Sequence, residues 1–205
     1  SMIGELSTFL RFSLESDSNI TVPFRDEIEA LDLYLRIEQV RFSDRLVVEQ
    51  TIKILKPYTK WILSFSCIEG NEHIPRLAHK HGLKTMVGTW LGDDDEKNEQ
   101  EIESLIALAA EGCVDIAAVG NEVLYRNDLT LEQLLTFIKR VRKAIPSHIP
   151  IGYVDAYYEF SLHPELVEHS DVILSNCYPF WEGCPEEYTL NNMQNMYGQA
   201  VSAAT

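Results

Sequence analysis

The sequence predicts an α/β fold: about five parallel strands with helices, forming part of a (β/α)8 TIM-type barrel and preceded by an amino-terminal helical segment. After about residue 50, short continuous apolar runs alternate with amphipathic helical patterns, which is typical of parallel strands buried on both faces. Before residue 50 only helical periodicity is found. The first apolar run is followed by a segment with a single glycine (residues 67–70) and not by the Gly-rich turn of a Rossmann-type sheet, which favours a barrel.

Residues 1–49 are predicted to be a helical segment distinct from the α/β domain of residues 50–205. Ile28, Leu31 and Leu35 recur at the spacing of one helix face, and Pro23 suits the first turn of that helix. An earlier helix is expected over residues 3–14. The segment therefore contains two helices and no clear strand.

The α/β domain is predicted from five apolar runs and the helices between them. The strands are expected at residues 61–67, 83–90, 114–119, 149–154 and 172–177. The helices are expected at residues 71–81, around 102–109, from 130 to 146, and at about 186–203. Thr130 and Gln133 have the spacing of a capping box, and Gly82 and Gly112 stand where helices end.

Composition narrows the functional classes. The chain has 205 residues, of which 45% are hydrophobic, so it has enough material for one sizeable core. Its formal net charge of -15 means that it is repelled by the phosphate backbones of nucleic acids and by anionic membranes. No apolar run is long enough to span a bilayer and no signal peptide is visible, so we expect a cytoplasmic protein if the start is native. The four cysteines form no CxxC pair, and we expect no metal ion and no cofactor.

The residues that follow the predicted strands point to carbohydrate chemistry. In an α/β barrel the active site lies at the carboxyl ends of the strands. Those ends carry carboxylates, amides and aromatic rings: Ser66, Glu69, Trp90, Asp93, Asn121, Glu122, Asp155, Tyr157, Asn176, Tyr178 and Trp181. Sugars require this mixture, since their CH faces stack on rings and their hydroxyls pair with polar groups. The aromatic residues are also compatible with core packing, but their clustering at two strand ends favours a sugar cleft.

Glu122 is the strongest candidate for a catalytic residue. It follows the apolar run 114–120 and Asn121 without an intervening loop, so its carboxyl group is held rigidly, as a general acid requires. The alternative is a surface glutamate that caps the turn before Asn127, and the spacing alone leaves both open. Residues 93–96 are a run of acidic side chains, for which we favour a helix cap near Asn98 over a cation site.

From about residue 54 onward the chain resembles glycoside hydrolase family 17, the β-1,3-glucanase-related group. The matching runs include Ala-Val-Gly-Asn-Glu-Val-Leu-Tyr-Arg (118–126), together with 55–62, 82–91, 152–160 and 176–183. The resemblance implies an eight-stranded barrel and retaining hydrolysis of a β-glucan, with Glu122 as the acid/base and Asn121 on the sugar 2-hydroxyl. We expect further substrate contacts from Asp155, Tyr157, Tyr178 and Trp181.

The family's nucleophile is a glutamate after the seventh strand, in a Glu-Thr-Gly-Trp-like run that this sequence does not contain. The nucleophile is therefore unassigned, and we expect an incomplete barrel. Leu63 also stands where relatives usually carry arginine.

The amino-terminal runs 6–14 and 34–46 resemble the dimerisation region of LytS-like sensor histidine kinases, without that family's phosphoacceptor histidine. Two functions follow. The first is a β-glucan-active retaining glycosidase, and the alternative is a non-catalytic signalling or interaction protein with a helical dimerisation segment. Because an open five-stranded sheet exposes two edges, we expect a homo-oligomer.

Overall fold

The computed structural model describes residues 44–204, with side chains from residue 48. The helices predicted at residues 3–14 and after Pro23 lie outside the described residues. The chain divides into two units between Ile54 and Leu55. The first described element, helix α3 (Asp44–Leu55), runs through the domain boundary predicted at residues 49 and 50, and that boundary stays a prediction.

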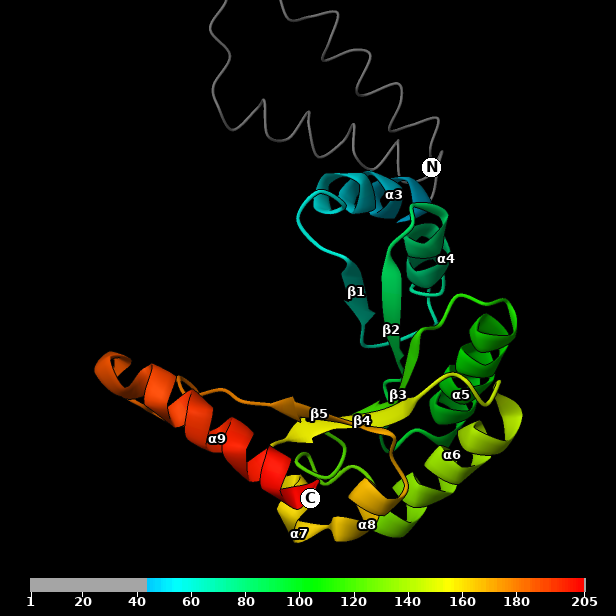
Figure 1. The fold of residues 1–205 in the computed structure, drawn as a ribbon. Coiled ribbons are helices and arrows are strands. Elements are labelled where there is room, and N and C mark those ends of the chain that lie inside the picture. The colour runs from blue at the N-terminus through cyan, green and yellow to red at the C-terminus, as the bar shows by residue number, and fades with distance from the viewer. Residues whose placement is uncertain (1–43, 205) are drawn as a thin grey trace, which may run out of the picture. The chain divides into compact units, whose positions relative to one another are not determined.

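The second unit contains five parallel strands in the order of the sequence, as Figure 1 shows. They are β1 (Trp61–Ser64), β2 (Lys84–Gly88), β3 (Ile116–Asn121), β4 (Ile151–Ala156) and β5 (Val172–Asn176). Each lies within a few residues of its predicted position, and β1 and β5 form the two edges. The sheet curls as part of a barrel does, so the predicted partial (β/α)8 fold is confirmed.

Helices lie between successive strands and after β5. They are α4 (His73–Lys80), α5 (Asp95–Ala110), α6 (Leu131–Ala144), α7 (Glu159–Leu162), α8 (Pro164–Glu168), the 3-10 turn η1 (Glu186–Tyr188) and α9 (Thr189–Ala203). The predicted Thr130–Gln133 capping box begins α6. The acidic run also provides a cap, because the Asp94 carboxylate accepts hydrogen bonds from two backbone N–H groups of α5 at 3.1 Å.

Helices α7 and α8 were not predicted. They have four and five residues, so neither is long enough to show a helical period. The break between them falls at His163, the residue before Pro164, where helical backbone is disfavoured. This short pair matters because it begins directly beside the residues that follow β4.

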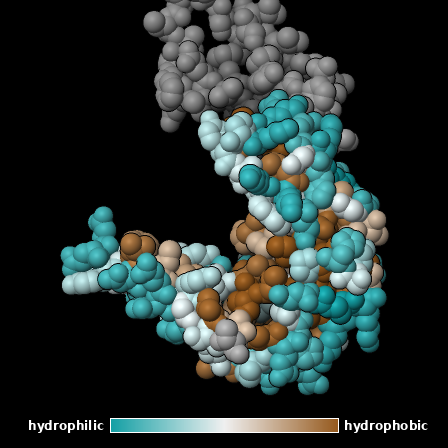
Figure 2. Space-filling view, in the orientation of Figure 1, coloured by the Kyte–Doolittle hydropathy of each residue, from teal (hydrophilic) through white to brown (hydrophobic). Residues whose placement is uncertain are grey.

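The core lies between the sheet and helices α5 and α6. Val87, Ala117 and Ile151 share one register row of the sheet and are fully buried on that side. The other face is less covered, since Leu63 is exposed to 41% and its register partner Met86 is half-buried. Apolar side chains gather on the concave side of the second unit (Figure 2). Within residues 44–204, no helix has the length and apolar character that crossing a bilayer would need.

Candidate active site

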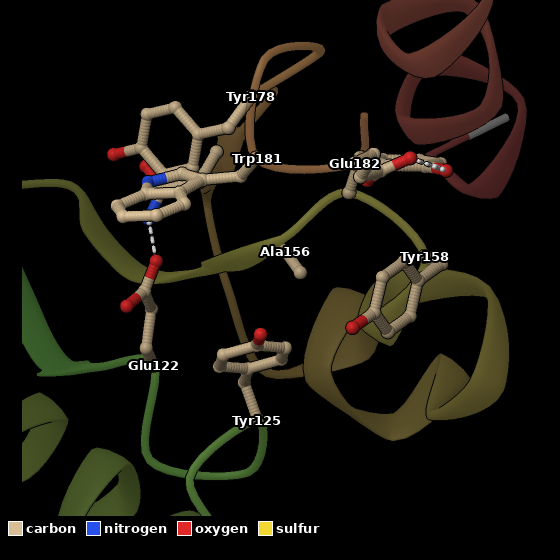
Figure 3. A pocket seen from close by; sticks show the side chains of 9 residues that line it. Glu122, Tyr125, Ala156, Tyr158, Tyr178, Trp181 and Glu182 are labelled. Atoms are coloured by element: carbon tan, nitrogen blue, oxygen red, sulfur yellow. Dashed lines mark hydrogen bonds between the residues drawn. The ribbon is translucent and has the colours of Figure 1, made fainter. Parts of the chain in front are cut away.

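A cleft of about 620 Å³ opens at the carboxyl ends of β3, β4 and β5 (Figure 3). This is the edge of the sheet where the sequence places the functional residues. Its lining residues are Glu122, Tyr125, Ala156, Tyr157, Tyr158, Asn176, Tyr178, Trp181 and Glu182. Four of the six predicted site residues are in this set: Glu122, Tyr157, Tyr178 and Trp181.

Glu122 directly follows β3 and is half-buried in the wall of the cleft. Its backbone N–H donates to the carbonyl oxygen of Val154 at 2.7 Å, which ties the end of β3 to β4. Its carboxylate Oε1 accepts a hydrogen bond from Nδ2 of Asn176 at 2.6 Å, as Figure 3 shows. The side chain therefore contacts β5 across the mouth of the sheet, which favours the catalytic interpretation over a cap on the following turn.

The backbone around Glu122 is unusual. Gly120 has φ +90° and Glu122 has φ +52°, so two residues near the end of β3 are left-handed. A side chain on Gly120 would bring its Cβ to 3.0 Å from Cγ2 of Val123. A left-handed non-glycine residue costs on the order of 1 kcal/mol and is found preferentially at functional sites. The chain accepts this cost at the residue that the sequence marks as catalytic.

Asn121 and Asp155, the other two predicted site residues, lie behind the wall and do not line the cleft. Asn121 is 6% exposed, and its Oδ1 has no hydrogen-bond partner among the described residues. Asp155 has no exposed surface. Its carboxylate accepts hydrogen bonds from the hydroxyl of Tyr153 and from the backbone N–H of Ala156 at 2.7 Å.

Burial raises the pKa of the Asp155 carboxyl group, and the negative charge of Glu122 adds to that effect. The hydrogen bonds from Tyr153 and Ala156 act in the opposite direction. Burial and the same Glu122 charge also raise the pKa of Tyr178. Among the described residues that line the cleft there is no lysine, arginine or histidine. The field in the cleft therefore favours positive charge, such as that of an oxocarbenium-like transition state.

Aromatic rings form most of the remaining lining. Trp181 and Tyr178 lie toward Glu122 in Figure 3, whereas Tyr158 and Glu182 lie on the other side. Tyr157 and Tyr158 meet edge to face with 5.3 Å between ring centroids. The hydroxyl of Tyr157 is 3.5 Å from Oε2 of Glu182. Exposed rings beside a carboxylate can stack on sugar faces while the carboxylate exchanges a proton with the glycosidic oxygen.

Arg126 connects the turn after β3 to the end of β2. Its guanidinium donates to the backbone carbonyl oxygens of Asn121 at 2.5 Å and Leu91 at 3.1 Å. It also forms an ion pair with Asp128 at 2.6 Å and stacks over the ring of Trp90 at 4.5 Å from the centroid. The turn that carries Glu122 is thus attached to strands on both sides.

Sequence reasoning did not identify Tyr125, Glu182 or Arg126 as site residues, and it included Tyr158 only as one ring of the aromatic cluster at two strand ends. Tyr125 and Arg126 are three and four residues after Glu122, so the helical path of the turn returns Tyr125 to the cleft. Tyr158 precedes α7, which was not predicted. Glu182 follows Trp181 in the loop after β5, and its proximity to Tyr157 depends on the folding of two loops.

Comparison with known proteins supports both family resemblances, that to glycoside hydrolases and that to histidine kinases. Residues 38–205 match the BtgE/BtgC glycoside hydrolase domain, and residues 1–46 match a histidine kinase family. The glucan 1,3-beta-glucosidase of Schizosaccharomyces pombe is 29% identical over 164 residues, which are 74% of this chain and 50% of that protein. The glucan 1,3-beta-glucosidase of Saccharomyces cerevisiae is 26% identical over 66% of this chain and 48% of that protein.

A solved structure has a similar fold. It is an active-site mutant of the Rhizomucor miehei beta-1,3-glucanosyltransferase in complex with laminaritriose. The TM-score is 0.69 at 27% identity, and the similarity covers 76% of this chain and 60% of that chain. The chain spans about half the length of the curated relatives it matches. Because the family match covers most of the sequence, this chain belongs to the BtgE/BtgC glycoside hydrolase domain family.

Proposed function

We propose that this chain binds β-1,3-glucan in the cleft at the ends of β3–β5 and acts on its glycosidic bonds, with Glu122 as the acid/base. One observation carries the proposal: Glu122 is fixed at a strand end in the wall of an aromatic cleft of about 620 Å³. The relatives support it, since they are glucan 1,3-beta-glucosidases and a glucanosyltransferase solved with laminaritriose.

In this proposal the Glu122 carboxyl group protonates the glycosidic oxygen as its bond to the anomeric carbon breaks and a nucleophilic carboxylate, unassigned in this chain, bonds to that carbon. Glu122 then takes a proton from the water molecule whose oxygen displaces the nucleophile. Asn176 holds Oε1, which leaves Oε2 for the substrate. Tyr157, Tyr178 and Trp181 stack on the sugar rings. The family resemblance also implies a contact from Asn121 to the sugar 2-hydroxyl, and because Asn121 lies behind the wall, this contact requires the wall to open toward its buried Oδ1. A buried polar atom without a partner costs about 1–3 kcal/mol, so a ligand or water is expected there.

A retaining mechanism also needs a second carboxylate about 5–5.5 Å from the first. Glu182 is the other carboxylate among the residues that line the cleft, and it lies beside Tyr157. The resemblance instead implies a glutamate after a seventh strand. We therefore assign Glu182 no catalytic role, and hydrolysis by the Glu182→Gln variant at the rate of the unmodified chain would support that assignment.

Hydrolysis of laminari-oligosaccharides by this chain, compared with its Glu122→Gln variant, tests the proposal. Turnover that is lost in the variant, with laminaritriose still bound in calorimetric titration, would support it. Turnover that persists in the variant would contradict the role of Glu122. A chain that neither cleaves nor binds laminaritriose would overturn the proposal as a whole.

A second candidate is a non-catalytic interaction protein. It is favoured by the histidine kinase match over residues 1–46 and by the two edge strands β1 and β5. We propose that residues 1–49 form a helical segment separate from the hydrolase domain and that the chain forms a homo-oligomer. Size-exclusion chromatography with light scattering tests the assembly, and a stable monomer would contradict it. Laminaritriose binding without turnover would favour this second candidate over the enzyme.

A further inference from the structure

The turn that carries Glu122 needs support, because its backbone is strained at both ends. Glu122 and Asn127 both have positive φ, at +52° and +58°. Left-handed backbone at non-glycine residues persists only where the surrounding structure holds it. The hydrogen bonds that reach into residues 122–127 therefore decide where the Glu122 carboxylate points.

One support comes from two buried side chains of β4. The hydroxyl oxygen of Tyr153 accepts a hydrogen bond from the backbone N–H of Leu124 at 3.0 Å. The same hydroxyl donates its proton to Oδ2 of Asp155. The backbone N–H of Tyr125 also points to Oδ2, at 3.4 Å. Tyr153 and Asp155 have no exposed surface, so this support is sealed from water and from any ligand in the cleft.

The geometry points to Asp155 as a positioning residue: acting through Tyr153, it locks the turn 122–126 so that Glu122 faces the cleft. This inference rests on the proposed role of Glu122 as the acid/base. It changes the role of Asp155 from the substrate contact expected from the sequence to a group that orients the catalytic turn from behind.

Electrostatics supports this role. Burial is the main cause that raises the pKa of Asp155, so the folded chain is more stable when this group is protonated than when it is charged. A buried charge that costs stability is typically retained where function needs it. The carboxylate accepts hydrogen bonds on both oxygens, whereas the isosteric amide of asparagine has one acceptor oxygen, so either the Tyr125 N–H or the Ala156 N–H would face an NH2 donor.

Backbone hydrogen exchange in the full chain tests the lock without requiring activity. In Asp155→Asn we expect the amide of Tyr125 or of Ala156 to exchange about tenfold faster, because one of the two loses its acceptor. In Tyr153→Phe we expect the same of the Leu124 amide. The melting temperature of Asp155→Asn should not fall. A group that only stabilised the fold would instead lower the melting temperature and accelerate exchange in β3 and β5 together.

Glu101→Gln is the matched control, since Glu101 is also a buried carboxylate that accepts a backbone N–H, that of Cys67 at 3.0 Å. This variant should accelerate exchange at Cys67 and leave Leu124 and Tyr125 unchanged. Unchanged exchange at Leu124 and Tyr125 in both β4 variants would overturn the lock.

Laminaritriose titration separates this inference from the proposed function. If the unmodified chain binds the trisaccharide, we expect the affinity of Asp155→Asn to fall about tenfold, and an unchanged affinity would overturn the lock. If the unmodified chain does not bind it, the proposed function fails, and the exchange rates alone decide whether Asp155 holds the turn.

Discussion

The segments after β1 and β3 each contain a glutamate with left-handed backbone, but the two glutamates lie in different surroundings. Glu69 and Glu122 are both glutamates with left-handed backbone, at φ +55° and +52°, shortly after a strand. A buried carboxylate contacts each segment, since Glu101 accepts the N–H of Cys67 and Asp155 accepts that of Tyr125. Yet only Glu122 lines the cleft.

The difference lies in what each glutamate faces. The side chain of Glu69 is 72% exposed and pairs with Lys97 at 3.8 Å. Glu122 is half-buried, bonded to Asn176 and flanked by the rings of Tyr178 and Trp181. A glutamate with left-handed backbone after a strand is therefore not enough to line a cleft. Glu122 does so where neighbouring strands bring a partner amide and aromatic rings.

The most direct test of this difference is to replace each glutamate by glutamine in turn and compare the two variants. We expect Glu122→Gln to lower the hydrolysis rate on laminari-oligosaccharides by about 10²–10⁴-fold, the usual contribution of a general acid/base. Glu69→Gln should change the rate less than about twofold, because its pairing with Lys97 is a surface contact. Equal effects of the two variants would show that the location of Glu122 is not what matters.

We expect a substitution of the left-handed glycine at the end of β3 to cost more stability than a substitution of a left-handed glycine elsewhere in the chain. Gly120→Ala should destabilise the fold by about 2–3 kcal/mol, since alanine at φ +90° is strained and its Cβ would lie 3.0 Å from Val123. Gly112→Ala is the matched control: Gly112 has φ +78°, but nothing lies within 4 Å of an added Cβ. It should cost about 1 kcal/mol. Urea unfolding measures both, and equal losses would mean that packing around Gly120 adds nothing.

Glu122 also differs from Glu69 in having aromatic rings beside it in the cleft, among them that of Trp181. Trp181→Ala should weaken laminaritriose binding by about tenfold, the effect of losing one stacking ring, without changing the melting temperature. The side chain of Trp181 is 81% exposed, so its removal leaves no core cavity. Tyr58→Ala removes a ring that is about as exposed, at 86%, but does not line the cleft. A loss of affinity in that control as large as in Trp181→Ala would contradict a specific role for Trp181.

The sequence predicted the strands well because their apolar runs are continuous, and strand ends follow from strand positions. Glu122, Tyr157, Tyr178 and Trp181 were placed at the site for that reason. The complete burial of Asp155 was not predicted, since the sequence suggested a substrate contact for it. Side chains alternate along a strand, so Asp155 shares the helix-facing side with the buried Tyr153, whereas Ala156 faces the cleft. Applying that alternation to the last residues of β4 would have predicted the burial.

Other features could not be read from the sequence at all. The bond between Glu122 and Asn176 joins residues 54 positions apart and depends on the register of β3, β4 and β5. The stacking of Arg126 on Trp90 likewise depends on how two loops meet. Such contacts are set by tertiary packing, for which local propensity has no signal.

The smallest expected effect concerns the charge behind the β3 turn. Because the folded pKa of Asp155 is raised, its contribution to stability is complete below its ordinary pKa of about 4 and is lost as pH rises through the raised value. Asp155→Asn has no such titration. The melting temperature of the variant minus that of the unmodified chain should therefore be larger at pH 7 than at pH 4.

The groups that face Asp155 set the size of this change. Glu122 and Glu159 are carboxylates whose charges interact unfavourably with that of Asp155, and Tyr153 is its hydroxyl donor. Glu159 also has a pKa raised by burial and by the Asp155 charge, so removing that charge relieves it and increases the difference at pH 7. A melting-temperature difference that shrinks between pH 4 and pH 7 would mean that hydrogen bonds to Asp155 outweigh its burial. The Asp155 carboxylate behind the turn after β3 would then stabilise the fold at neutral pH, and the contrast with an isosteric amide would lose its basis.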